Sequence, residues 1–289
     1  MIKQVLRTTA LAAAGLMLTL PAKAGMVDDA ISAFAELDGY VQKSNDQIED
    51  YEMDAAKTSL DEAQDGIAEY GELLNGINDA SDNLAGLLGD AWEPAVSASA
   101  NLSARITDTL GRVDSGTADF DGLISAADNA ESAFNTARAF TQQFRGKLFA
   151  FREVTLADMR KLFDSDVGPN LEAARAALTA RNGNEAQAKL ALVVKALETL
   201  MSQANAAASM TVTLGDSVTK ATESVWPSFA VLQKDVQSLQ AVAGKSNPAS
   251  ALATVTASED TADKALNEAV NRMTDIEGRF VLICDSACR

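Results

Sequence analysis

A seven-residue repeat of apolar side chains constrains the fold of this chain more than any other feature of its sequence. The repeat first appears at Val27, Phe34, Val41 and Ile48, and a companion series follows three positions later. It slips near residues 55–60 and then resumes along the chain. This spacing places apolar side chains along one side of an α-helix that packs against other helices. Because no alternating strand pattern of useful length occurs, we expect an all-α fold, an elongated antiparallel helical bundle with coiled-coil-like long helices.

The longest stretch of the repeat predicts an unusually long helix. Ser99, Ile106, Val113 and Phe120 begin a series that reaches Leu148 in one phase. A helix unbroken from residue 95 to residue 163 would be ~100 Å long at 1.5 Å per residue. The absence of a polar linker predicts one extended domain over residues 25–289. Its expected elements are long helices at about 27–88 and 95–163, a helical hairpin at about 169–222, and shorter helices at about 228–243 and 249–283.

Residues 1–24 read as a cleaved signal peptide of the Sec type. Lys3 and Arg7 precede an apolar stretch at residues 10–20, and Ala22-Lys23-Ala24 presents small residues at the cleavage site. The apolar stretch is shorter than the roughly 20 residues that span a membrane as a helix. We therefore expect cleavage after Ala24 and a periplasmic or secreted protein.

The charge of the chain narrows the choice of partners. Without residues 1–24 the chain has 41 acidic and 21 basic side chains, a net charge of −20. Such a surface repels nucleic acid and anionic lipid headgroups. We expect a protein partner and no nucleic acid, with membrane contact only after a conformational change. A homo-oligomer is a further possibility, because the apolar repeats of different helices could pack against each other within one chain or between two chains.

The composition argues against catalysis. The chain has no histidine, which excludes Ser-His-Asp and Cys-His catalysis and histidine-ligated zinc. Residues 217–220 match the Ser-x-x-Lys of serine β-lactamases without that family's sheet, and residues 244–246 lack the first glycine of a P-loop. A loose oxygen-ligand site at Asp164 and Asp166 is the remaining alternative, although an EF-hand would need glycine at Pro169. We predict no enzyme, no cofactor and no metal.

The two cysteines, Cys284 and Cys288, close the chain at four residues' separation. In an oxidising compartment we expect them to bond to each other, because residues one helical turn apart fall within disulfide range. So short a loop adds less than the ~3 kcal/mol expected of a 15-residue loop. The expected effect is local: the bond keeps residues 280–283 docked.

Trp92 is the sequence's best candidate for a contact residue. It lies between Gly89 and Pro94, where a helix end is expected, and glycines are frequent on both sides. The glycines indicate either a mobile tip or a close approach of two backbones. The favoured hypothesis is an exported helical bundle with a structural or partner-binding role and an interaction tip at Trp92. The alternatives are a pore-forming-like protein that inserts this tip, and an accessory subunit of a periplasmic secretion or surface assembly.

Overall fold

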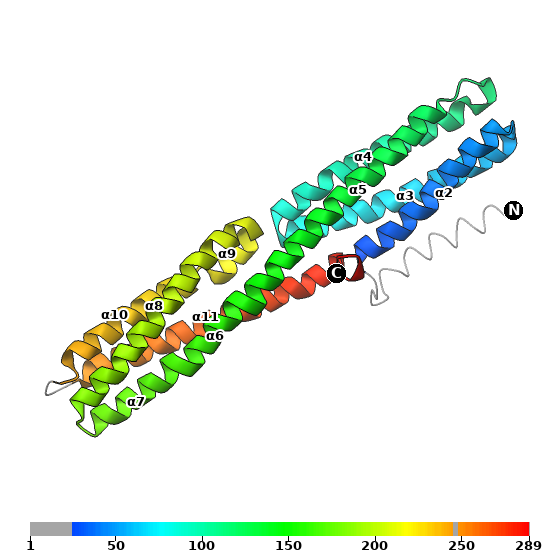
Figure 1. Ribbon diagram of the computed structural model, residues 1–289. Coiled ribbons are helices and arrows are strands. Elements are labelled where there is room, and N and C mark those ends of the chain that lie inside the picture. Colours follow the sequence, from blue (N-terminus) through cyan, green and yellow to red (C-terminus); the bar gives the residue numbers. More distant parts are fainter. Residues whose placement is uncertain (1–24, 245–247, 289) are drawn as a thin grey trace, which may run out of the picture.

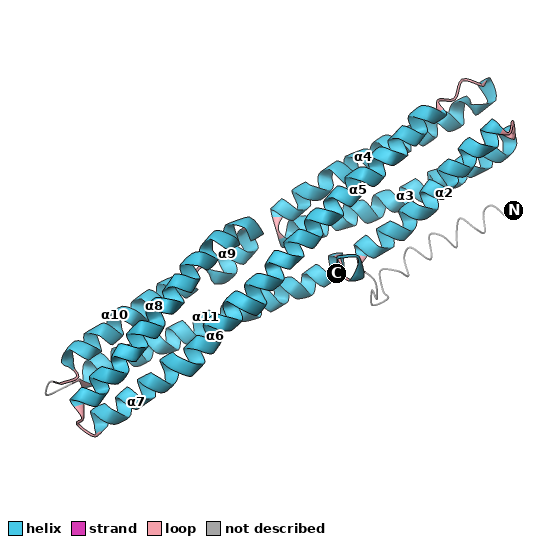
Figure 2. Ribbon diagram, viewed as in Figure 1, coloured by secondary structure: helices cyan, strands magenta, loops and turns pink. Residues whose placement is uncertain are grey.

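The protein is an elongated all-α bundle, as the sequence predicts. The computed structural model describes residues 25–244 and 248–288, so the predicted signal peptide lies outside the described residues. Within these ranges the chain has no strand (Figure 2). No helix of this part is long and apolar enough to cross a membrane. The elements are α2 (Met26–Glu49), α3 (Met53–Leu84), α4 (Gly86–Arg112), η1 (Val113–Ser115), α5 (Phe120–Phe149), η2 (Ala150–Leu156), α6 (Ala157–Leu162), η3 (Phe163–Val167), α7 (Gly168–Thr179), α8 (Gly183–Leu214), α9 (Asp216–Thr222), α10 (Val225–Val242), α11 (Ala249–Ile283) and η4 (Ser286–Cys288).

The helices form two four-helix bundles joined end to end (Figure 1). The first bundle consists of α2, α3, α4 and α5, and the second consists of α6–α7, α8, α9–α10 and α11. One uninterrupted rod, α5 through α7, runs through both bundles from residue 120 to residue 179. We call the region where the bundles meet the waist. There Gly215, between α8 and α9, approaches Ala85, between α3 and α4, so that a Cβ on Gly215 would lie 3.3 Å from the Cβ of Ala85.

The apolar stripes form one connected core through both bundles. In the first bundle Tyr70 contacts Phe34 and Phe134, with ring centroids 5.1 and 6.1 Å apart, and Trp92 meets Phe134 edge-on at 5.5 Å. In the second bundle Phe163 stacks on Phe229. Aromatic pairs at these separations contribute about 0.5–1.5 kcal/mol beyond their burial.

The two longest predicted helices are wrong, because the chain turns inside each of them. The stretch 27–88 folds back at residues 50–52, and the stretch 95–163 folds back at residues 113–119. The predicted break at residues 89–95 is absent, since Ala85 breaks the chain earlier in an extended conformation and Pro94 lies inside α4. Both helices of an antiparallel hairpin bury a row of apolar side chains with the same spacing. The repeat therefore continues from one helix to the next and does not show where the chain turns.

The rod also extends past its predicted end at residue 163. Residues 164–170 stay helical, and Pro169 lies in the first turn of α7 instead of starting a separate hairpin. The predicted hairpin turns at residues 180–182, between α7 and α8. Gly215, with φ of 88°, then ends α8 within the predicted hairpin arm.

Two π-helical segments lie within the rod and change its repeat. Buried residues along α5 alternate at spacings of three and four, but Phe151 to Leu156 is a step of five. Three successive steps of four, from Met159 through Phe163 and Val167 to Leu171, add a second extra residue. These steps coincide with η2 and η3, and a π-turn accommodates one additional residue without rotating the helix that follows. The π segments therefore keep the apolar stripe of α6 and α7 facing the core.

Arginines tie the rod to α11 in the second bundle. The ion pairs join Arg152 to Glu277, Arg160 to Asp263, and Arg175 to Glu259. Arg160 also pairs with Asp164 on its own helix, and this hydrogen-bonded carboxylate raises the pKa of the guanidinium. The pairs are only partly exposed, so each is screened less by salt than a fully exposed pair.

Candidate interaction surface

The structure moves the predicted contact residue into the core. Trp92 is completely buried, and its Nε1 donates a hydrogen bond of 3.1 Å to Oγ1 of Thr141. Gly89 is buried where α4 meets α3, since a Cβ there would lie 2.8 Å from the Cβ of Asp82. Pro94 is exposed on α4. The prediction of an interaction tip at these residues is wrong, because α4 begins at Gly86 and carries Trp92 inward from the waist.

The predicted disulfide is present, outside the helix. Cys284 and Cys288 are bonded with their Cα atoms 5.7 Å apart. α11 ends at Ile283, and the chain from Cys284 onward forms an extended residue followed by the short η4. Phe280 and Ile283 are buried as expected, but Val281 and Leu282 are exposed, so the expected docking of residues 280–283 holds for two of the four.

The two residues of the candidate oxygen-ligand site, Asp164 and Asp166, each bind another protein side chain. Asp164 pairs with Arg160, and Asp166 accepts a hydrogen bond of 2.6 Å from Ser165. Among the described residues no group of three potential metal ligands comes together.

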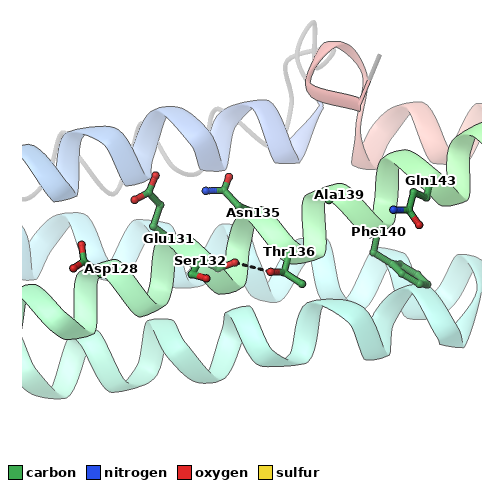
Figure 3. A pocket seen from close by; sticks show the side chains of 8 residues that line it. All are labelled: Asp128, Glu131, Ser132, Asn135, Thr136, Ala139, Phe140 and Gln143. Atoms are coloured by element: carbon green, nitrogen blue, oxygen red, sulfur yellow. Dashed lines mark hydrogen bonds between the residues drawn. The ribbon is translucent and has the colours of Figure 1, made fainter.

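Two hollows on the described surface are shallow. The larger is a depression on the outer face of α5 whose lining comes from that helix alone (Figure 3). Its residues are Asp128, Glu131, Ser132, Asn135, Thr136, Ala139, Phe140 and Gln143. A smaller cleft at the waist is lined by Asn83, Leu84, Ser217, Ala221, Arg272, Asp275, Ile276 and Arg279. Ser217 and Lys220 of the Ser-x-x-Lys match lie on the short helix α9, with Ser217 in this cleft.

The acidic charge is concentrated in the first bundle. Residues 25–149 carry 24 acidic and 7 basic side chains, whereas residues 150–289 carry 17 acidic and 14 basic ones. The corresponding net charges are −17 and −3. A field of this sign attracts cations and positively charged protein surfaces to the first bundle.

The far end of this bundle exposes a tyrosine in a strained backbone conformation. Tyr51 is 86% exposed and has a φ of 62°, in the left-handed region that bulky residues rarely adopt. Its N–H donates to the carbonyl of Ile48 at 3.0 Å, and the N–H of Glu52 donates to the carbonyl of Gln47 at 2.7 Å. This is the turn that closes many helices, at a position usually occupied by glycine.

We call residues 49–54 the acidic apex. Its sequence is Glu-Asp-Tyr-Glu-Met-Asp, so four carboxylates surround the two apolar side chains. Met53 is 37% exposed. Next to it, Lys57 at the start of α3 pairs with Asp114 of η1 and joins the turn to the α4–α5 hairpin. The apex is thus an exposed aromatic group within negative charge on a braced hairpin.

The opposite end of the molecule has the same turn with a different residue. Arg181, between α7 and α8, has a φ of 57°. Its N–H donates to the carbonyl of Leu178 at 3.1 Å, and the N–H of Asn182 donates to the carbonyl of Ala177 at 2.8 Å. The two hairpins therefore share a backbone and differ in charge.

Sequence reasoning missed the acidic apex because Tyr51 carries none of the usual signals of a turn. The comparisons add no candidate: no family model, curated protein or solved structure matches the chain.

Proposed function

We propose that this is an exported, non-catalytic rod that binds a positively charged protein partner through the acidic apex of its first bundle. The observation that carries the proposal is the exposure of Tyr51 among four carboxylates at the end of the more acidic bundle. Tyrosine is enriched at protein interfaces because its ring is apolar and its hydroxyl can form hydrogen bonds. The surrounding carboxylates accelerate the approach of a basic surface and orient it.

The strain at Tyr51 supports a role in binding. A non-glycine residue in the left-handed conformation costs of order 1–3 kcal/mol and persists where other demands hold it in place. Glycine would satisfy the same turn without strain. A stable fold alone does not require tyrosine here.

A pair of substitutions separates binding from stability. Tyr51→Gly removes the aromatic group and relieves the backbone, and Arg181→Gly makes the same backbone change at the opposite end. Both variants should unfold at equal or higher temperature than the parent protein. A photo-crosslinking side chain at position 51 should give an adduct with a basic protein in intact cells, whereas one at position 181 should not.

The partner identified in this way is then tested in solution. Its affinity should fall with Tyr51→Gly, stay unchanged with Arg181→Gly, and weaken as salt is raised. The proposal would be contradicted by equal crosslinking at positions 51 and 181, or by an affinity that changes neither with salt nor with Tyr51→Gly.

A further inference from the structure

The two ends of the predicted mature chain meet at the waist. Gly25 is buried, and a Cβ on it would lie 2.6 Å from the backbone nitrogen of Asp285 and 3.0 Å from the Cα of Cys284. In Figure 1 the beginning of α2 lies beside the C-terminal end of the chain. Gly25 precedes α2, and its carbonyl accepts hydrogen bonds from the N–H groups of Asp28 and Asp29 at 2.8 and 3.2 Å.

Side chains of α5 hold the C-terminal turn in this place. Arg138 and Gln142 donate to the carbonyl of Ala287 at 3.0 and 2.9 Å, and Arg145 donates to the carbonyl of Asp285 at 2.8 Å. The disulfide closes the same turn. Three side chains thus hold the turn against α5, beside the start of α2.

One carboxylate oxygen at this junction is buried and unsatisfied. Oδ1 of Asp28 accepts a hydrogen bond from the hydroxyl of Ser286, whereas Oδ2 is buried with no hydrogen-bond partner. Asp28 is the third residue of α2, the position from which a carboxylate reaches back to the nitrogen of the residue before the helix. That residue is Gly25. A dehydrated carboxylate oxygen without a donor is costly, so a positive charge there would be strongly favoured.

We infer that removal of the signal peptide completes this junction, because the new α-ammonium group of Gly25 binds Asp28. Hydrolysis of the Ala24–Gly25 bond consumes one water, leaves a carboxylate on Ala24, and leaves the ammonium group on Gly25. The inference rests on the exported state in the proposed function and on cleavage after Ala24. It assigns the N-terminus a structural role: the mature chain end, Asp28 and Ser286 form one cluster that clamps α2 to the C-terminal turn.

The charges around the junction favour this arrangement. The charged residues at the junction are Asp28 and Asp29 in the first turn of α2, Asp285 in the C-terminal turn, and Arg138 and Arg145 on α5. Without the ammonium group this set is negative by one charge, and with it the set is neutral. Burial, and to a lesser extent the neighbouring charge of Asp28, raises the pKa of Asp29.

The ion pair predicts a pH dependence of defined sign. An α-amino group has an ordinary pKa of about 8, and pairing with a carboxylate raises it in the folded protein. The stabilisation is then complete below pH ~8 and is lost as the pH rises through the folded-state pKa.

The test compares mature protein that starts at Gly25, released from a cleavable N-terminal fusion, with the same protein acetylated at Gly25. At pH 7 acetylation should lower the melting temperature by ~2–4 °C, and the difference should vanish above pH ~10. Asp28→Asn should abolish the effect of acetylation, while the neighbouring Asp29→Asn should retain most of it. Titration of ¹⁵N-labelled Gly25 by NMR should give an amino pKa above that of the unfolded chain.

An unchanged melting temperature on acetylation, or an equal change in Asp28→Asn, would overturn the inference. N-terminal sequencing of the exported protein tests the cleavage site separately. Cleavage at another residue would refute the biological premise, whereas the acetylation result alone decides whether a Gly25 terminus binds Asp28.

Discussion

Tyr70 lies fully buried in the first bundle between Phe34 and Phe134, and its hydroxyl has no hydrogen-bond partner. A buried hydroxyl without a partner costs roughly 1–3 kcal/mol. Tyr70→Phe removes that cost and keeps the ring. We expect the variant to be more stable by about 1 kcal/mol in urea unfolding, while Tyr51→Phe, at an exposed ring, leaves the free energy of unfolding unchanged. A clear loss of stability in Tyr70→Phe would contradict the burial described for this hydroxyl.

Burial also makes the stability contribution of Tyr70 depend on pH. It raises the pKa of the hydroxyl above its usual value of about 10, so the neutral form is favoured in the folded state. Below pH ~10 the tyrosine is neutral in both states, but at higher pH it ionises readily only in the unfolded chain, so the free energy of unfolding of the parent protein falls as the pH rises towards the folded-state pKa. Urea unfolding at pH 8 and pH 11 should show the difference between the parent protein and Tyr70→Phe changing with pH. A constant difference would count against the shift.

The hydrogen bond of Trp92 gives the second prediction at this scale. Thr141→Val keeps the shape of the side chain but removes the acceptor of Trp92 Nε1. We expect a loss of about 1–3 kcal/mol in the free energy of unfolding, since the indole N–H stays buried without a partner. Thr136→Val is the matched control, because Thr136 makes the same hydrogen bond to its own helix on the exposed face of α5 and should change stability by less than about 0.5 kcal/mol. Equal effects of the two changes would refute the assigned role of Thr141.

Single residues also show what the sequence could not reveal. Trp92 was expected outside because Gly89 and Pro94 resemble the end of a helix, yet Gly89 allows α4 to approach Asp82 and Pro94 is tolerated within the helix. Tyr51 was overlooked because left-handed turns usually use glycine. Both errors arise where tertiary contacts override local preference.

At the scale of elements, the seven-residue repeat predicts the buried side chains well but does not predict where the chain turns. Val27, Phe34, Ile106 and Leu148 are all in the core as their spacing implies. The turn at residues 50–52 has no proline or glycine, so local composition could not locate it. The extra residues at η2 and η3 were not predicted, because the positions that break the repeat are identified by their burial in the structure.

The π-helical segments give the prediction at this scale. Deleting Val154, an exposed residue of η2, should convert the π-turn into regular helix while residues beyond it keep their faces. Deleting Ala139, which is exposed in the regular part of α5, rotates every residue beyond it by about 100°. We expect the first deletion to change the melting temperature by only a few degrees and the second to abolish cooperative unfolding, as followed by circular dichroism. Similar loss in both would show that η2 does not hold an extra residue.

At the scale of the whole molecule, the rod and the contact between the start of α2 and the turn after α11 hold the bundles in line. The rod α5–α7 crosses the waist without a break, and α11 ends where α2 begins. Bundles aligned in this way separate the acidic apex from the Arg181 turn by the full length of the molecule (Figure 1). This separation lets one end bind a partner while the other stays free.

Small-angle X-ray scattering of the mature protein tests this architecture most directly. Two bundles in line, with a rod of 60 residues at 1.5 Å each, predict a maximum dimension near 100 Å and a radius of gyration of about 30 Å. The same chain folded as a compact globule would give a radius of gyration near 18 Å. A value close to 30 Å supports the account, and a value close to 18 Å would contradict it.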